Sequence, residues 1–214
     1  MCFSTLKFAS LLSYSPRGVS ISEQESRTAM RKLKNDTPTE ERLTSQRISE
    51  IIRENITTLP FSNFFTTNTI LVPIPNSSFM QPGTLWVPQR LANALVKQEL
   101  GKEVIECLNR VISLRKAATS LAENRPKAVQ HYESLEVKEM LSEPPKEILF
   151  VDDIITRGTT IFGAANKLAD VFPQARIRAF AAMRTISPPF VFQKIYDPCV
   201  GTITLDVHNT FRRP

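Results

Sequence analysis

The sequence predicts an α/β fold, built on a parallel sheet with helices on its faces. The run Ile148–Val151 is apolar and rich in strand-forming residues, which is typical of a central parallel strand buried on both faces. From Thr69 onward, strand and helix patterns alternate, and this order favours parallel strands joined by right-handed crossovers. With 214 residues, 42% of them hydrophobic, the chain can bury a sizeable core.

Residues 1–68 are expected to form an N-terminal helical appendage, and residues 69–214 to form the α/β core. Helices are expected at Glu23–Lys34 and at Glu40–Asn55. They are separated by a segment that ends at Pro38, because the residue before a proline avoids helical geometry. The second helix carries an apolar stripe that must pack on the core.

The expected elements of the core follow from short apolar runs and from helix start and stop signals. Trp86 is expected to anchor the start of a core helix by packing rather than to stack on a base. The elements are, in order, a strand at Thr69–Pro75, a helix at Pro88–Leu100, a strand at Val104–Leu108, a short strand or loop at Tyr132–Val137, the strand Ile148–Val151, a helix at Thr160–Phe172, and strands at Ala175–Met183 and Val200–Leu205.

Two carboxylates, Asp152 and Asp153, follow the central strand directly. Adjacent carboxylates repel each other and lose hydration when partly buried, so a ligand that uses both would explain them. The vicinal hydroxyls of a ribose, or a hydrated magnesium ion, suit such a pair.

The loop Thr156–Thr160 reads Thr-Arg-Gly-Thr-Thr and precedes a helical pattern. Backbone N–H groups at a helix N-terminus, side-chain hydroxyls and a glycine together form a cradle for a phosphate. With the acidic pair, this segment can hold a ribose that carries a phosphate. The simpler alternative is that the acidic residues end a strand and Thr159 caps a helix, but it leaves the second carboxylate unexplained.

The stretch Ile148–Thr160 resembles the phosphoribosyl-pyrophosphate (PRPP) binding motif of type I phosphoribosyltransferases. It is closest to the competence-protein-F-like and amidophosphoribosyltransferase-like branches. The resemblance implies that family's parallel sheet flanked by helices, with the N-terminal appendage as a hood. It also implies that Asp152 and Asp153 hold the ribose hydroxyls and act electrostatically in catalysis. The residues implied for PRPP binding are Asp152, Asp153, Thr156, Arg157, Gly158, Thr159 and Thr160.

Two further loops are implied by the resemblance. Asn76, Ser77 and Ser78 occupy the position of the pyrophosphate loop, although no basic residue lies between Ile70 and Gln89 as it does in many relatives. The basic segment from Asn109 to His131 corresponds to a mobile loop that closes over the substrate. Its candidate contacts are Lys116 and Arg125.

The function implied is transfer of a 5-phosphoribosyl group from PRPP to an unknown nitrogen base, with release of pyrophosphate. Mg²⁺ would be carried by PRPP and lie near Asp152. Hypoxanthine and guanine enzymes have an acidic residue at the position of Thr156, so a 6-oxopurine acceptor is disfavoured. Two alternatives stay open: a PRPP-sensing or nucleotide-sensing protein without turnover, and a competence-like accessory protein acting near DNA.

The net charge of +6 is compatible with a phosphate-rich ligand or with nucleic acid. Basic residues form no long block and do not alternate with aromatic residues, which disfavours nucleic acid. No apolar run is long enough to span a membrane, and the first residues do not match a signal peptide. Cys2, Cys107 and Cys199 are widely spaced, as expected of free thiols in a cytoplasmic protein. A homodimer is left open.

Overall fold

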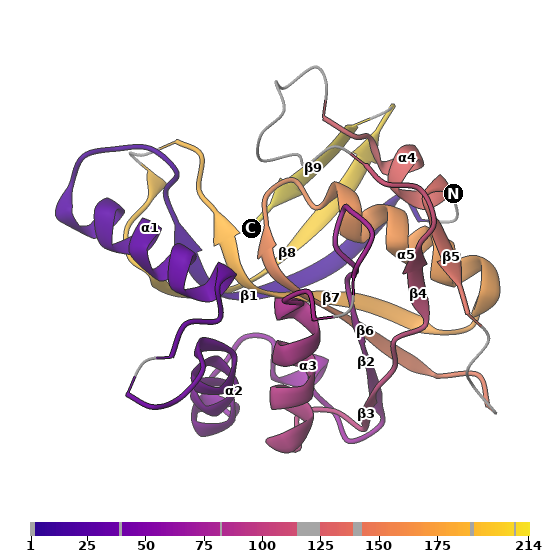
Figure 1. Ribbon diagram of the computed structural model, residues 1–214, viewed down its shortest axis with the longest axis horizontal. Helices are drawn as coiled ribbons and strands as arrows, with labels where there is room; N and C mark the ends of the chain where they lie inside the picture. The colour runs from indigo at the N-terminus through magenta and orange to yellow at the C-terminus, as the bar shows by residue number, and fades with distance from the viewer. Residues whose placement is uncertain are drawn as a thin grey trace.

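The computed structural model describes residues 3–38, 40–81, 83–114, 125–138, 143–188, 191–207 and 209–214. Its centre is a seven-stranded sheet (Figure 1). In spatial order the strands are β3 (Glu103–Val104), β2 (Thr69–Pro73), β6 (Glu147–Ile155), β7 (Arg176–Thr185), β1 (Thr5–Tyr14), β8 (Tyr196–Asp206) and β9 (Asn209–Arg213). The pairs from β3 to β1 are parallel, whereas β8 and β9 join antiparallel. The predicted α/β class with a mostly parallel sheet is confirmed.

Helices cover the sheet, and a small antiparallel sheet of two strands lies beside it. Of the described helices, none has the length and hydropathy required to span a bilayer. The helices are α1 (Ile21–Lys34), α2 (Thr44–Asn55), the 3₁₀ turn η1 (Ser62–Phe64), α3 (Val87–Lys97), α4 (Ala128–Glu133) and α5 (Thr159–Val171), and the small sheet pairs β4 (Leu108–Arg110) with β5 (Leu135–Val137).

Strand β6 is the middle one of the five parallel strands, and it is buried on both faces as its apolar run predicts. Its side chains alternate between two hydrophobic cores: Leu149 and Val151 join the core of α2 and α3, whereas Ile148 and Phe150 join the core of α5. All four side chains are buried. This burial on both faces holds the carboxyl end of β6 in a fixed position relative to its neighbours.

Strand β1 was not predicted, because the first residues were assigned to a helical appendage. The structure inserts β1 between β7 and β8, with Phe8 and Leu11 fully buried. The serines that interrupt the apolar pattern are accommodated by hydrogen bonds: Ser13 Oγ donates to the Lys194 carbonyl (2.8 Å), and Ser10 Oγ accepts from Arg184 (3.2 Å). The core sheet therefore includes a strand from residues 1–68, while the domain boundary at residue 68 stays a prediction.

The two N-terminal helices are present with shifted starts. Helix α1 begins earlier than expected because Ser20 forms a capping box, in which its Oγ accepts from the Glu23 N–H and the Glu23 carboxylate accepts from the Ser20 N–H. Helix α2 begins only at Thr44. Glu40 and Glu41 have φ of 51° and 66°, and this left-handed backbone cannot belong to a right-handed helix.

The segment after α3 differs most from the prediction. The expected strand Val104–Leu108 is divided: β3 ends at Val104 in the main sheet, and β4 begins at Leu108 in the small sheet. Residues 132–137 are split between the end of α4 and strand β5. This small sheet and α4 pack against α5, and the Leu114 N–H, four residues beyond β4, donates to the Ser77 carbonyl (2.8 Å) in the loop after β2.

Candidate functional site

The acidic pair lies where β6 extends beyond its neighbour β2. The last paired residues are Pro73 and Val151, and the Ile74 N–H donates to the Val151 carbonyl (2.9 Å). Strand β6 continues through the pair to Ile155, which is in register with Arg184 of β7. The carboxylates therefore lie at the carboxyl edge of the parallel sheet, where open α/β sheets bind ligands.

Both carboxylates accept hydrogen bonds from the backbone. Asp152 Oδ1 accepts from the Asp153 N–H (2.8 Å), and Asp153 Oδ1 accepts from the Ile154 N–H (2.6 Å). Burial raises the pKa of Asp152 well above its ordinary value, the charge of Asp153 raises it further, and the Lys34 ammonium opposes both effects. The pair therefore favours a partner that donates hydrogen bonds to it.

Lys34, at the end of α1, contacts the acidic pair directly. Its Nζ lies 2.7 Å from Asp153 Oδ2, and half of its side chain remains exposed. Burial has the largest single effect and lowers the pKa of Lys34, but the charge and hydrogen bond of Asp153, together with the charges of Asp152 and Tyr14, outweigh it, and the net shift is upward. The sequence analysis missed this residue as part of the site. It lies more than a hundred positions before the acidic pair and looked like one of several basic residues on the expected first helix.

The predicted phosphate loop joins β6 to the N-terminus of α5. Gly158 is the N-cap residue and has a left-handed backbone, with φ +77° and ψ 13°. A Cβ at this position would lie 2.6 Å from Cδ1 of the buried Ile203, so the loop requires a glycine on grounds of both backbone and space. The first N–H groups of α5 have no acceptors within the helix, and they form the positive end of the helix dipole.

The three threonine hydroxyls of the loop are held by other parts of the fold. Thr156 Oγ1 pairs with Thr185 (3.1 Å), Thr159 Oγ1 with Thr210 (2.9 Å), and Thr160 Oγ1 lies 3.4 Å from His131 Nε2. Strands β7 and β9 and helix α4 thus position the loop.

Arg212 of β9 also holds the loop in position, because its Nε donates to the Thr156 carbonyl (2.7 Å). Its guanidinium also donates to the Thr185 carbonyl. The sequence analysis did not predict β9 and therefore missed this contact with the loop.

The predicted pyrophosphate loop lies at the same edge of the sheet, after β2. Asn76, Ser77 and Ser78 are half-buried. The Asn76 carbonyl accepts from Nε of Arg110 (3.0 Å), a residue of β4 that is 8% exposed and also donates to Ser134 Oγ. Burial lowers the pKa of Arg110 to about 10. A buried arginine from another strand therefore lies directly behind the predicted loop.

Comparison with known proteins leaves the family of the chain unassigned. No protein-family model matches the sequence, and no curated protein matches it. Two crystal structures of a hypoxanthine phosphoribosyltransferase from Staphylococcus aureus are similar to this chain. The tetragonal form has a TM-score of 0.39 and 13% identity, over 72% of this chain and 78% of that one. The orthorhombic form has a TM-score of 0.35 and 11% identity, over 68% and 75%. Both TM-scores are low, so this likeness identifies neither family nor activity.

Of the two residues predicted to contact substrate from the mobile loop, only Arg125 lies within the described residues. Lys116 lies outside the described residues. Arg125 lies near Arg157 of the phosphate loop: burial lowers the pKa of Arg157, and the charge of Arg125 lowers it further. The structure thus brings one predicted mobile-loop residue next to the predicted phosphate loop.

Three further residues have structural roles. Trp86, the N-cap residue of α3, is buried, and its Nε1 donates to the Ile74 carbonyl (2.8 Å), so it anchors the start of this core helix as predicted. Arg184 is 4% exposed and paired with Asp197, which leaves it little access to a ligand. Cys107 is a buried free thiol whose pKa burial raises to about 11.

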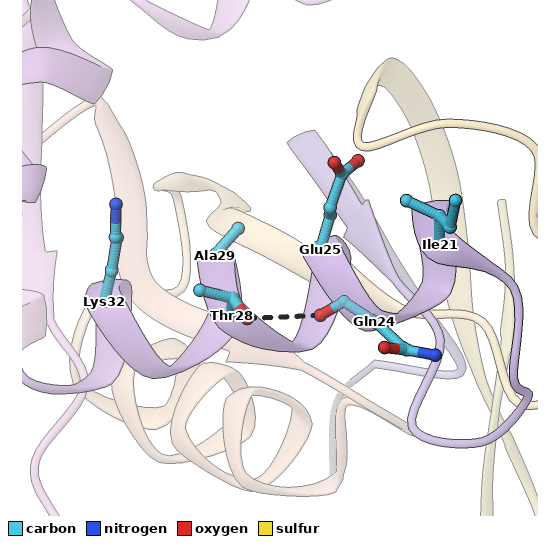
Figure 2. A pocket seen from close by; sticks show the side chains of 6 residues that line it. All are labelled: Ile21, Gln24, Glu25, Thr28, Ala29 and Lys32. Atoms are coloured by element: carbon cyan, nitrogen blue, oxygen red, sulfur yellow. Dashed lines mark hydrogen bonds between the residues drawn. The ribbon is translucent and has the colours of Figure 1, made fainter.

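A surface hollow of about 410 Å³ lies elsewhere, along the outer face of α1. Figure 2 shows its lining, which comes from this one helix: Ile21, Gln24, Glu25, Thr28, Ala29 and Lys32. It contains none of the predicted site residues. The candidate site is instead the edge of the sheet formed by the acidic pair and the two loops.

Proposed function

We propose that this protein binds PRPP and transfers its 5-phosphoribosyl group to a nitrogen base, with release of pyrophosphate. The observation that carries the proposal is the continuous unit formed by the end of β6, the Thr156–Thr160 loop and the start of α5. It presents two carboxylates and then, after four residues, the left-handed glycine that caps the N-terminus of a helix. Carboxylates accept from ribose hydroxyls, and the N–H groups and hydroxyls of the loop bind the 5-phosphate.

The pyrophosphate would be held on the β2 side of the acidic pair. Asn76, Ser77 and Ser78 offer hydroxyl, amide and backbone donors there, and Arg110 adds a buried positive charge directly behind the loop. A guanidinium close to a departing anion stabilises the charge that develops in the transition state. Arg125, near the phosphate loop, and Lys116 are the proposed contacts of a closing segment.

In the proposed reaction, the bond between ribose C1 and the pyrophosphate oxygen breaks while a bond from C1 to the base nitrogen forms. Positive charge develops on the sugar. Asp152 and Asp153 hold the sugar hydroxyls and favour that charge electrostatically, without accepting a proton from the acceptor.

The donor set fits Mg²⁺ that is carried by the ligand. The described residues include no group of three or more acidic, histidine or cysteine side chains that would hold a metal alone. Carboxylates combined with substrate phosphates are a common environment for Mg²⁺, so Asp152 and Asp153 would contact the ion that PRPP brings. That ion would supply charge neutralisation of the pyrophosphate.

The acceptor class is restricted by Thr156. Its side chain is a hydroxyl bonded to Thr185, so this position offers no carboxylate to a purine ring. We therefore propose a nitrogen base other than a 6-oxopurine. Assignment to the competence-protein-F-like branch remains part of the proposal.

The test is calorimetry of the full chain with PRPP, with and without Mg²⁺, beside the double variant Asp152→Asn/Asp153→Asn. We expect Mg²⁺-dependent binding to the wild type and loss of at least tenfold in affinity in the double variant, whose thermal stability should be retained. Asp206→Asn, an exposed carboxylate at the end of β8, is the matched control. Equal PRPP affinity in the wild type and the double variant would refute the site. Binding without pyrophosphate release over a panel of bases would favour the PRPP-sensing alternative.

A further inference from the structure

The end of α1 is fixed in position by a buried polar network. Asp36, two residues beyond Lys34, is 1% exposed and accepts hydrogen bonds from the Ser45 N–H (2.8 Å) and from Arg90 (3.2 Å). These contacts tie the turn after α1 to helices α2 and α3. Lys34 therefore approaches the acidic pair from an anchored backbone, and only its side chain needs to move.

Lys34 bonds to the oxygen of Asp153 that a sugar hydroxyl would use. Asp153 Oδ1 is already engaged by the Ile154 N–H, and Oδ2 by Lys34 Nζ at 2.7 Å. The Asp153 side chain is only 9% exposed, whereas that of Lys34 is 51% exposed. A ligand diol that bonds to both carboxylates must therefore displace the ammonium group or share its oxygen.

The displaced ammonium group needs a new partner, and the nature of the ligand decides whether it finds one. A sugar diol is neutral and cannot replace the charge of Asp153. A second anionic group on the β2 side of the site could do so, because the end of α1 lies near that side: Asp36 accepts from Arg90 of α3, and α3 packs on β2. The side chain of Lys34 is long and flexible enough to turn from one anion to another.

Resting on the proposed function, we propose that Lys34 is a specificity-determining residue. It opposes binding of ligands that offer only a diol and a 5-phosphate, and it favours ligands that carry a further anionic group at C1. The site would thereby discriminate PRPP from ribose 5-phosphate. This role belongs to the N-terminal helix and not to the loop that follows β6.

The experiment compares the affinities of ribose 5-phosphate and PRPP for the wild type, Lys34→Met and Lys34→Arg by calorimetry with Mg²⁺. Half-exposed ion pairs are modest in strength, so we expect Lys34→Met to bind ribose 5-phosphate about fivefold more tightly. Its PRPP affinity should be unchanged or weaker, so the preference for PRPP should fall by about fivefold or more. Lys34→Arg keeps the charge and should retain the preference within about twofold.

Lys32→Met is the matched control, because it removes the same charge from the same helix. Lys32 lines the separate hollow on the outer face of α1 (Figure 2), and the preference for PRPP should not change. Binding of ribose 5-phosphate by Lys34→Met but not by the wild type would also support the proposal. Equal shifts for both ligands, or no shift for either, would overturn it while leaving the proposed function standing. If neither protein binds either ligand, both proposals fail.

Discussion

Replacing Gly158 by alanine tests whether the loop before α5 has the geometry described. Two penalties are expected. A residue with a Cβ in the left-handed region costs about 1–2 kcal/mol, and Gly158 has φ +77°. The added Cβ would also lie 2.6 Å from Ile203 Cδ1 and 2.8 Å from its Cγ1, in a side chain that is fully buried. Overpacking of this kind costs roughly 1–3 kcal/mol, so the total loss should be about 2–5 kcal/mol.

Gly83→Ala separates the two penalties. Gly83 has φ +79°, but an added Cβ there meets no atom within 4 Å. Urea unfolding should therefore give a loss of about 1–2 kcal/mol for Gly83→Ala and a larger one for Gly158→Ala. Ile203→Val removes the closest atom and should be less destabilising in the Gly158→Ala background than in the wild type. Equal losses for the two glycine variants would refute the close contact between the loop and β8.

Two further predictions concern buried titratable groups. Because burial and Asp153 raise the pKa of Asp152 in the folded state, its ionised form opposes folding. Asp152→Asn should therefore raise the free energy of unfolding at pH 7, and this gain should disappear below about pH 4, where the unfolded carboxyl is also protonated. A gain that persists at pH 3 in urea titrations would contradict this. Burial, reinforced by Arg110, lowers the pKa of His131 to about 3. Protonation of the unfolded imidazole should then remove roughly 4–5 kcal/mol of stability between pH 6.5 and 3. The glutamine of the His131→Gln variant can still hydrogen-bond to Thr160. This variant should lose less stability than the wild type between pH 6.5 and 3, as urea unfolding at a series of pH values would show.

The parts of the fold that could be predicted from the sequence are those in which local pattern and tertiary role agree. Strand β6 is an uninterrupted apolar run because both of its faces are buried, and the turn into α5 needs its glycine for local reasons. The acidic pair and the Thr156–Thr160 loop therefore take the positions, at a strand end and before a helix, that one short stretch of sequence predicts. Helix α1 was placed within two residues, since its capping residues lie next to it in the sequence.

The parts that could not be predicted depend on contacts between distant residues. Strand β1 contains serines whose burial is explained by Arg184, by Cys199 and by the carbonyl of Lys194, all far along the chain. Strand β4 looked like the end of a longer strand, yet it leaves the main sheet and brings Arg110 to the Asn76 carbonyl. No periodicity in the sequence indicates which of many arginines and lysines will lie near the acidic pair.

The charges around the acidic pair depend on residues that lie far from the motif in the sequence. The motif itself supplies two adjacent carboxylates, and burial makes full ionisation of this pair unfavourable. The cations that balance them, or that would face an anionic ligand, come from separate segments: Lys34 from α1 and Arg110 from β4, with Arg157 the only one inside the loop. Under the proposed function, the short motif would bind a ribose phosphate, whereas the preference among ribose phosphates would depend on residues that the tertiary fold brings to the edge of the sheet. Substitution of Lys34 in α1 or of Arg110 in β4 should accordingly change which ligand is bound, and substitutions in the motif should change whether any is bound.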